Sequence, residues 1–170
     1  MRAVARCART ALAAVLLLAA LSLRAQDDTL GHPAGDERVR LLLVEAGLVS
    51  EVDADGDFRV IMAFESGRSQ QVFVRSRTST LDGLEIREIF SPAAVGDSLD
   101  RRDNLLLLLL ANHDYTLGAW ELEPARDGHA ALFTLRVPVD PEAAVLRRLI
   151  GAAAQAADEM ELTLTGRDDL

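Results

Sequence analysis

The chain has 170 residues, enough for one domain with its own hydrophobic core. Its 27 acidic residues outnumber its 18 basic residues, and every basic residue is arginine. The formal charge of −9 disfavours nucleic acid and anionic membrane surfaces as partners. The lack of lysine excludes a phosphate-loop lysine and Schiff-base chemistry.

The first 25 residues predict a secretory signal peptide. Arginines without any acid occupy residues 1–10, an apolar run follows at 11–23, and Ala25 supplies a small residue for cleavage. We expect cleavage after Ala25 and a periplasmic or secreted product with no membrane association. The alternative is an uncleaved anchor, although the run is shorter than the roughly 20 residues that span a bilayer. Cleavage removes four arginines and Cys7, so the formal charge becomes −13 and no cysteine remains.

Residues 26–35 are polar and contain glycine and proline, which predicts a flexible linker with a solvated His32. Asp36 is a suitable N-cap for a first helix over 37–46, and Gly47 favours a left-handed stop after it. The apolar stripe of this helix consists of Val39, Leu42, Leu43 and Ala46.

Six short segments rich in β-branched and aromatic residues predict strands. Pairs of the type Asp-Gly or Ser-Gly lie between several of them, which indicates antiparallel hairpins with two-residue turns. In the fourth segment we expect Leu84, Ile86 and Phe90 to share one face, with Glu88 as an outlier. The predicted strands are 48–52, 58–64, 70–76, 84–90, 117–123 and 130–136, and the turn pairs are Asp55-Gly56, Ser66-Gly67, Asp82-Gly83 and Asp127-Gly128.

Pro92 and Gly96 break the strand pattern, and a second helix is predicted over 99–112, with Asp97 or Ser98 as its cap. It contains six consecutive leucines, which surround the helix axis at about 100° per residue. Such a helix has no polar face and requires two burial surfaces, one on the sheet and another on a helix or a second subunit. We therefore predict an interaction surface and a homodimer. The surface residues are Leu105, Leu106, Leu109 and Leu110.

The segment 138–166 predicts a long third helix, with Asp140 as its cap and Pro141 at the first helical position. Alanine predominates in its middle, so it can lie close to whatever it packs against. Residues 167–170 are expected to form a tail. The predicted apolar stripe consists of Val145, Leu149, Ala152, Ala156 and Met160.

Three aspartates within residues 53–57 resemble a calcium loop. Such a loop would use Asp53, Asp55 and Asp57 as ligands, with glycine at its sixth position and glutamate at its twelfth. Both of those positions hold phenylalanine, and a strand-like segment follows instead of a helix. We interpret the run as a hairpin corner and expect no metal or cofactor. The alternative is a metal- or small-ligand-binding protein that acts through this acidic hairpin.

Other patterns that suggest catalysis have simpler explanations. Residues 112–115 place Asn, His, Asp and Tyr side by side, but such residues are ordinary helix terminators. Glu65-Ser66-Gly67 lacks the second glycine of a nucleophile elbow. Glu121 and Glu123 are unsurprising in so acidic a chain and give no evidence for glycoside hydrolysis. We expect no enzymatic activity, a core position for Trp120, and a solvated His129.

The order of four segments resembles that of the YbjN family of bacterial sensory transduction regulators. The matching segments are 53-DADGDF-58, 109-LLANHDYTLGAWELE-123, 137-VPVD-140 and 156-AADEMELTL-164, so the resemblance extends over about residues 36–165. It implies the fold of type III secretion chaperones, an α+β domain over residues 36–166. In that domain a twisted antiparallel sheet of five to six strands is packed by three helices, and such proteins are often dimeric.

The resemblance carries no catalytic residue and no cofactor to this sequence. Family members are often cytoplasmic, whereas this chain begins with a predicted export signal. We therefore expect a non-enzymatic, exported protein-interaction or regulatory module, with a protein partner or a second copy of itself as ligand.

Overall fold

The computed structural model describes residues 34–168, which form an α+β domain. A six-stranded antiparallel sheet packs against three α-helices, and this confirms the predicted fold class. The leader, its cleavage site and most of the predicted linker lie outside the described residues. Gly35 was assigned to the linker, but it packs closely on the ring of Phe58, since a Cβ atom at this position would lie 2.5 Å from that ring. The folded domain therefore includes the last residue of the expected linker.

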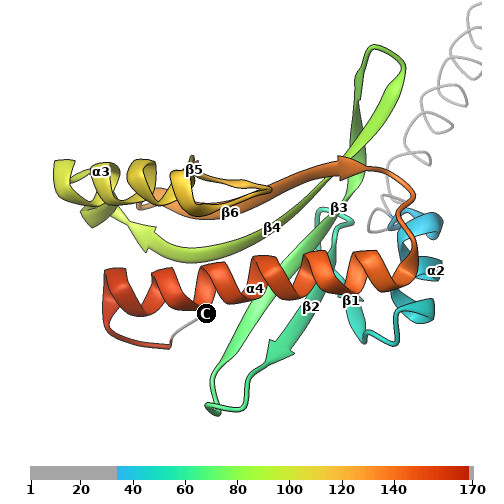
Figure 1. The fold of residues 1–170 in the computed structure, drawn as a ribbon, viewed down its shortest axis with the longest axis horizontal. Helices are drawn as coiled ribbons and strands as arrows, with labels where there is room; N and C mark the ends of the chain where they lie inside the picture. Colours follow the sequence, from blue (N-terminus) through green and yellow to red (C-terminus); the bar gives the residue numbers. More distant parts are fainter. Residues whose placement is uncertain (1–33, 169–170) are drawn as a thin grey trace, which may run out of the picture. The chain divides into compact units, whose positions relative to one another are not determined.

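The sheet has the strand order β1-β2-β3-β4-β6-β5, so β1 and β5 are its edges (Figure 1). The strands are β1 (Ser50–Val52), β2 (Phe58–Ala63), β3 (Ser69–Leu81), β4 (Leu84–Gly96), β5 (Ala119–Ala125) and β6 (Gly128–Pro138). The helices are α2 (Glu37–Glu45), α3 (Arg102–Ala111) and α4 (Ala143–Thr165), and the short 3₁₀ turns are η1 (Asp97–Asp100) and η2 (Asn112–Asp114). Among residues 34–168 there is no helix long and apolar enough to cross a membrane.

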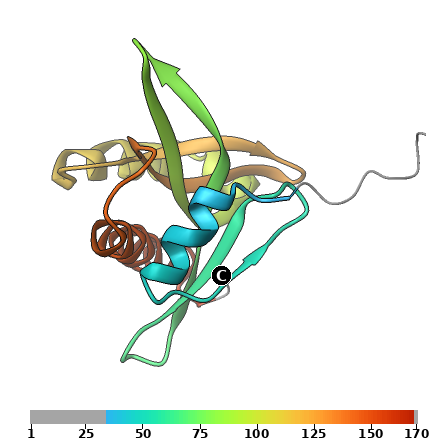
Figure 2. The same cartoon turned by 90° about the vertical axis from the view of Figure 1, so that its right-hand side faces the viewer.

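Helix α4 crosses one face of the sheet and packs on β3, β4 and β6 (Figures 1 and 2). Its buried side differs from the predicted stripe, because Ala152 is exposed whereas Leu146 and Ile150 are buried. An alanine-rich helix offers two neighbouring apolar sides, and the sheet covers the side that carries the larger residues. The buried apolar residues of α4 are Ala143, Leu146, Ile150, Ala153, Ala154, Ala156, Ala157 and Met160.

The predicted caps of the second and third helices are wrong. Helix α4 begins at Ala143, and Glu142 occupies the cap position without a side-chain hydrogen bond. Helix α3 begins only at Arg102, because residues 97–100 form a separate 3₁₀ turn and Arg101 is extended. The cap of α2 is confirmed, since Asp36 Oδ1 accepts the backbone N–H of Arg38 at 2.9 Å.

Strands β3 and β4 are longer than predicted, and β4 continues through Pro92. Proline has no N–H to donate within a central strand, and a register shift between Pro92 and Ala94 accommodates it. Of the predicted two-residue turns, Asp82-Gly83 has positive φ at both residues. At 53–57 and 64–68 only the glycine has positive φ, and the loops span five residues.

Leu84, Ile86 and Phe90 share one face of β4 with Glu88, as the sequence predicted, but this is not the face that α4 covers. Arg87, Ile89 and Ser91 point toward α4 and are buried, whereas Glu88 and Phe90 lie on the opposite face. The apolar alternation does not mark the buried face here, because an arginine occupies an interior position.

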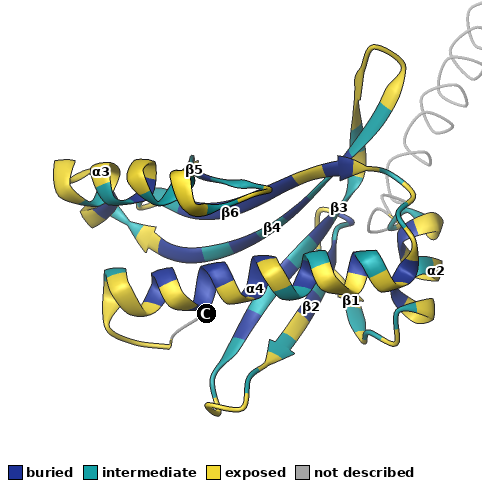
Figure 3. Ribbon diagram, viewed as in Figure 1, coloured by how far each residue is buried: buried dark blue, intermediate teal, exposed yellow. Residues whose placement is uncertain are grey.

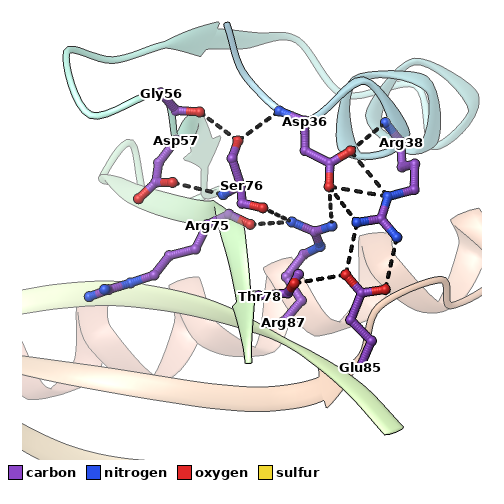
Figure 4. A network of polar contacts seen from close by, with 9 residues as sticks. All are labelled: Asp36, Arg38, Gly56, Asp57, Arg75, Ser76, Thr78, Glu85 and Arg87. Carbon is purple, nitrogen blue, oxygen red and sulfur yellow. Dashed lines mark hydrogen bonds and ion pairs between the residues drawn. The ribbon is translucent and has the colours of Figure 1, made fainter. Parts of the chain in front are cut away.

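Arg87 links the middle of the sheet to the start of α2. Its side chain is 3% exposed, and one terminal nitrogen donates to the carbonyls of Arg75 and Ser76. These carbonyls lie in an irregular segment of β3, where the register with β4 shifts. The other terminal nitrogen donates to Asp36 Oδ2 at 2.7 Å (Figure 4).

The network around Asp36 extends to the tip region of the β3–β4 hairpin. Arg38 pairs with Asp36 and with Glu85, whose Oε1 also accepts from the Thr78 hydroxyl at 2.7 Å (Figure 4). Arg38 and Arg87 hold the pKa of Asp36 well below its ordinary value. Arg38, followed by Thr78, lowers the pKa of Glu85 to about 2.

Replacement of Arg87 by methionine tests this link. The variant leaves the Asp36 carboxylate and two β3 carbonyls without their buried donor, so the free energy of unfolding should fall by about 3–5 kcal/mol in urea denaturation. Arg77→Met, at an exposed position on β3, is the matched control and should change stability by less than about 0.5 kcal/mol. Equal losses in the two variants would contradict the role of Arg87.

The lowered carboxyl pKa values predict a loss of stability in acid. Asp36 and Glu85 titrate below their ordinary pKa values of 3.8 and 4.5 in the folded chain, so they stabilise it above those values. That contribution disappears as the pH falls from about 4.5 toward about 2. Asp57 opposes this trend weakly, because burial raises its pKa. Arg38→Met should flatten the acid dependence of the urea midpoint, and Arg126→Met should not; an unchanged slope in Arg38→Met would refute the assignment.

Candidate interaction surface

Four leucines of α3 face away from the domain. Leu105, Leu106, Leu109 and Leu110 are 39%, 47%, 68% and 63% exposed, whereas Leu108 is 4% exposed and Leu107 is half-buried (Figure 3). One side of the leucine-rich helix is thus buried within the domain, as the sequence predicted. The other side has no cover from residues 34–168, and we refer to these four exposed leucines as the α3 surface.

Side-chain hydrogen bonds and a small aromatic cluster fix α3 to the edge strand β5. Asn112, at the end of the helix, accepts the backbone N–H of Trp120 at 2.6 Å and donates to the carbonyl of the same residue at 3.4 Å. The Trp120 ring is buried against Phe133, with 5.4 Å between the ring centroids. Tyr115 packs on the same Phe133 ring, with 4.5 Å between the centroids. The α3 surface is therefore held on a rigid base.

A shallow groove runs between α3 and β5. It is lined by Leu105, Leu108, Leu109, Asn112, Trp120, Glu121 and Leu122. The groove continues the α3 surface toward the sheet edge, so a partner that covers the leucines can also contact β5. Asn112, Trp120 and Leu122 were not predicted as parts of this surface, since eight residues separate the amide of Asn112 from the strand that it meets.

The four exposed leucines together present a considerable apolar area to solvent. Together their exposed fractions equal about two complete leucine residues. Burial of that much apolar area by a partner gives about 3–6 kcal/mol. Contiguous apolar patches on soluble domains commonly mark interaction sites.

Other exposed apolar side chains lie on several elements. Leu41 and Val44 are on α2, Val52 and Ile61 are on β1 and β2, and Leu81 is at the β3–β4 hairpin tip. Each of these elements carries fewer exposed large apolar residues than α3. We therefore treat the α3 surface as the principal candidate within the described residues.

The acidic hairpin uses its carboxylates to build the turn. Asp53 Oδ1 accepts the backbone N–H groups of Asp55 and Asp57, each at 2.9 Å. Asp57 Oδ1 accepts the N–H of Ser76 at 2.7 Å (Figure 4). Burial raises the pKa of Asp57, although the Ser76 N–H opposes this shift. Within residues 34–168 no three acidic, histidine or cysteine side chains gather as a metal-binding group.

The catalytic patterns of the sequence do not assemble into a site. Asn112 turns to β5, while His113 and Asp114 are exposed. His129 is not fully solvated as predicted, because its Nδ1 lies 2.6 Å from Asp100 Oδ1 and the residue is half-buried.

The glutamates of β5 form ion pairs across the open face of the sheet. Glu121 pairs with Arg136, and Glu123 pairs with Arg75 at 3.2 Å. Arg75 also lies 4.9 Å from the centre of the Phe90 ring. These charges neutralise one another, which is typical of a solvated sheet face.

No protein-family model, curated protein or solved structure matches this chain.

A pair of substitutions in the acidic hairpin separates a structural role from a metal-binding role. Asp53→Ala removes the acceptor of two N–H groups and should lower the free energy of unfolding by about 1–2 kcal/mol. Asp55→Ala, at an exposed position two residues away, should change it by less than about 0.5 kcal/mol. Addition of calcium should leave the melting temperature of the parent chain unchanged. A calcium-dependent rise that either substitution abolishes would restore the metal hypothesis.

Proposed function

We propose that this chain is an exported, non-enzymatic protein-interaction module that binds its partner through the α3 surface. The observation that carries the proposal is the exposure of four leucines on a helix whose opposite side is already buried. A helix that served only the fold of this domain would be polar on its outer side. The apolar outer side is explained by a contact that lies outside the chain.

The rigid attachment of α3 supports a binding role. Asn112 and the buried Trp120 hold the helix on β5, so little conformational entropy is lost when a partner covers it. The groove beside the helix supplies further apolar contact from Trp120 and Leu122. A preorganised apolar surface of this kind suits a helix or loop of a protein partner.

The sequence supplies the remaining parts of the proposal. The leader over residues 1–25 favours export to the periplasm or beyond, and the order of motifs resembles the YbjN family, whose α+β architecture agrees with the fold observed here. Because the formal charge of the exported chain would be −13, nucleic acid is disfavoured as the partner. No contact in residues 34–168 favours the alternative of a ligand site at the acidic hairpin.

Site-specific photocrosslinking tests this function. A photoreactive residue in place of Leu109 should give a protein adduct in the native host, because a bound partner must lie against this position. The same residue in place of Ser79, an exposed position on β3, is the control and should give none. Leu106→Asp should abolish the Leu109 adduct while the circular dichroism spectrum stays unchanged, since Leu106 is exposed. Absence of any adduct at Leu109 would overturn the proposed function.

A further inference from the structure

The irregular segment of β3 brings two arginines to one point on the face of the sheet that α4 leaves open. The register of β3 and β4 shifts there, so residues 75–77 stand opposite the single residue Glu88. Arg75 and Arg77, at the two ends of this bulge, both line a cleft on the open face together with Glu88. Bulges re-aim side chains in this way and are common next to active sites.

The domain holds the bulge in place from its buried side. The guanidinium of Arg87 donates to the carbonyls of Arg75 and Ser76, and its side chain is almost fully buried. Burial of a guanidinium is costly, and regular pairing of β3 with β4 would satisfy these carbonyls without it. Figure 4 shows that the side chain of Arg75 points away from this network. The bulge therefore contributes to the open face chiefly through the positions of its two arginines.

The carboxylates around the cleft engage Arg75 and leave Arg77 free. Arg75 lies 3.2 Å from a carboxylate oxygen of Glu88 and 3.2 Å from one of Glu123. Glu88 also pairs with Arg136, at 3.0 Å. Within residues 34–168, Arg77 takes part in none of the ion pairs, and it is exposed to solvent. Its guanidinium is thus available to an anion from outside the chain.

We propose that this cleft binds a small aliphatic carboxylate. The planar fork of Arg77 can donate two parallel hydrogen bonds to a carboxylate, and the Ser79 hydroxyl is a further donor beside it. Ile86, paired with Ser79 across the two strands, offers an aliphatic contact for the rest of the ligand. The cleft has a volume of about 380 Å³, within the range of about 300–1,000 Å³ that is usual for small-molecule sites. This site is separate from the α3 surface and goes beyond the proposed function.

The charges around the cleft favour a ligand with one negative charge over a ligand with two. The glutamates already neutralise Arg75, so Arg77 supplies the single free positive charge of the lining. Glu88 lies in the same lining, and the whole chain has a formal charge of −9. A second negative charge on the ligand would be repelled by both. A monocarboxylate balances Arg77 and adds no excess charge.

Titration of the isotope-labelled full chain with hexanoate, followed through the chemical shifts of its backbone amides, tests the site. The amides of residues 75–79 and 86–88 should shift and saturate, with a dissociation constant of about 0.1–10 mM for so small a ligand. Hexanamide has the same aliphatic part without the charge and should bind at least about tenfold more weakly. Inorganic phosphate should also bind more weakly than hexanoate. Equal binding of hexanoate and hexanamide would overturn the proposal, and tighter binding of phosphate would overturn the ligand class.

Substitutions at Arg77 locate the contact. Arg77→Met should weaken hexanoate binding at least about tenfold, because a charge-assisted pair of hydrogen bonds is lost, and its exposed position leaves the fold intact. Arg77→Lys keeps the charge without the fork and should give an intermediate affinity. Arg126→Met, an exposed arginine outside the cleft, is the matched control and should bind as the parent does. Unchanged binding in Arg77→Met would overturn the proposal.

A variant of the α3 surface separates this inference from the proposed function. Leu106→Asp should leave hexanoate binding unchanged, because Leu106 does not line the cleft. Loss of hexanoate binding in this variant would contradict a separate site. Failure of hexanoate to bind the parent chain would remove the carboxylate site alone, since the photocrosslinking at Leu109 does not depend on it.

Discussion

The buried guanidinium of Arg87 is the interaction on which the arrangement of this domain depends. Without a donor at this point, β3 could not leave its regular pairing, because the carbonyls of Arg75 and Ser76 would be buried without a partner. The same guanidinium holds Asp36, which caps α2. One side chain therefore fixes the irregularity of the sheet and the position of the first helix.

The region around Arg87 carries paired charges on its surface, whereas the β5 edge carries leucines. Near Arg87, the polar groups of α2, the acidic hairpin and the β3–β4 hairpin satisfy one another, so that region presents paired charges. At the β5 edge, the single amide of Asn112 takes over the backbone groups of Trp120, and α3 completes the cover with leucine. The edge strand β5 is thereby covered at Trp120, and α3 presents an apolar surface beside it.

Local signals in the sequence predicted the parts of the fold that depend on local physics. Asp36 as a cap, Gly47 as a stop and Asp82-Gly83 as a turn each act through backbone conformation within a few residues. Which face of β4 is buried could not be predicted, because Arg87 is interior and Phe90 is not, and only partners 11 to 51 residues distant make that possible. Likewise, the run of leucines predicted two burial surfaces, but the groove with Trp120 depends on a contact that spacing does not reveal.

The composition of α3 is difficult to explain by the stability of one chain. Leu108 alone reaches the core fully, and polar residues at the four outer positions would leave that contact intact. Exposed leucines normally favour aggregation, and the acidic surface of the rest of the chain counteracts this through mutual repulsion. The two features together would limit an apolar contact to the small area of the α3 surface. Outer leucines that a partner would cover and a net charge that keeps the free chain apart are the two features on which the proposed interaction module rests.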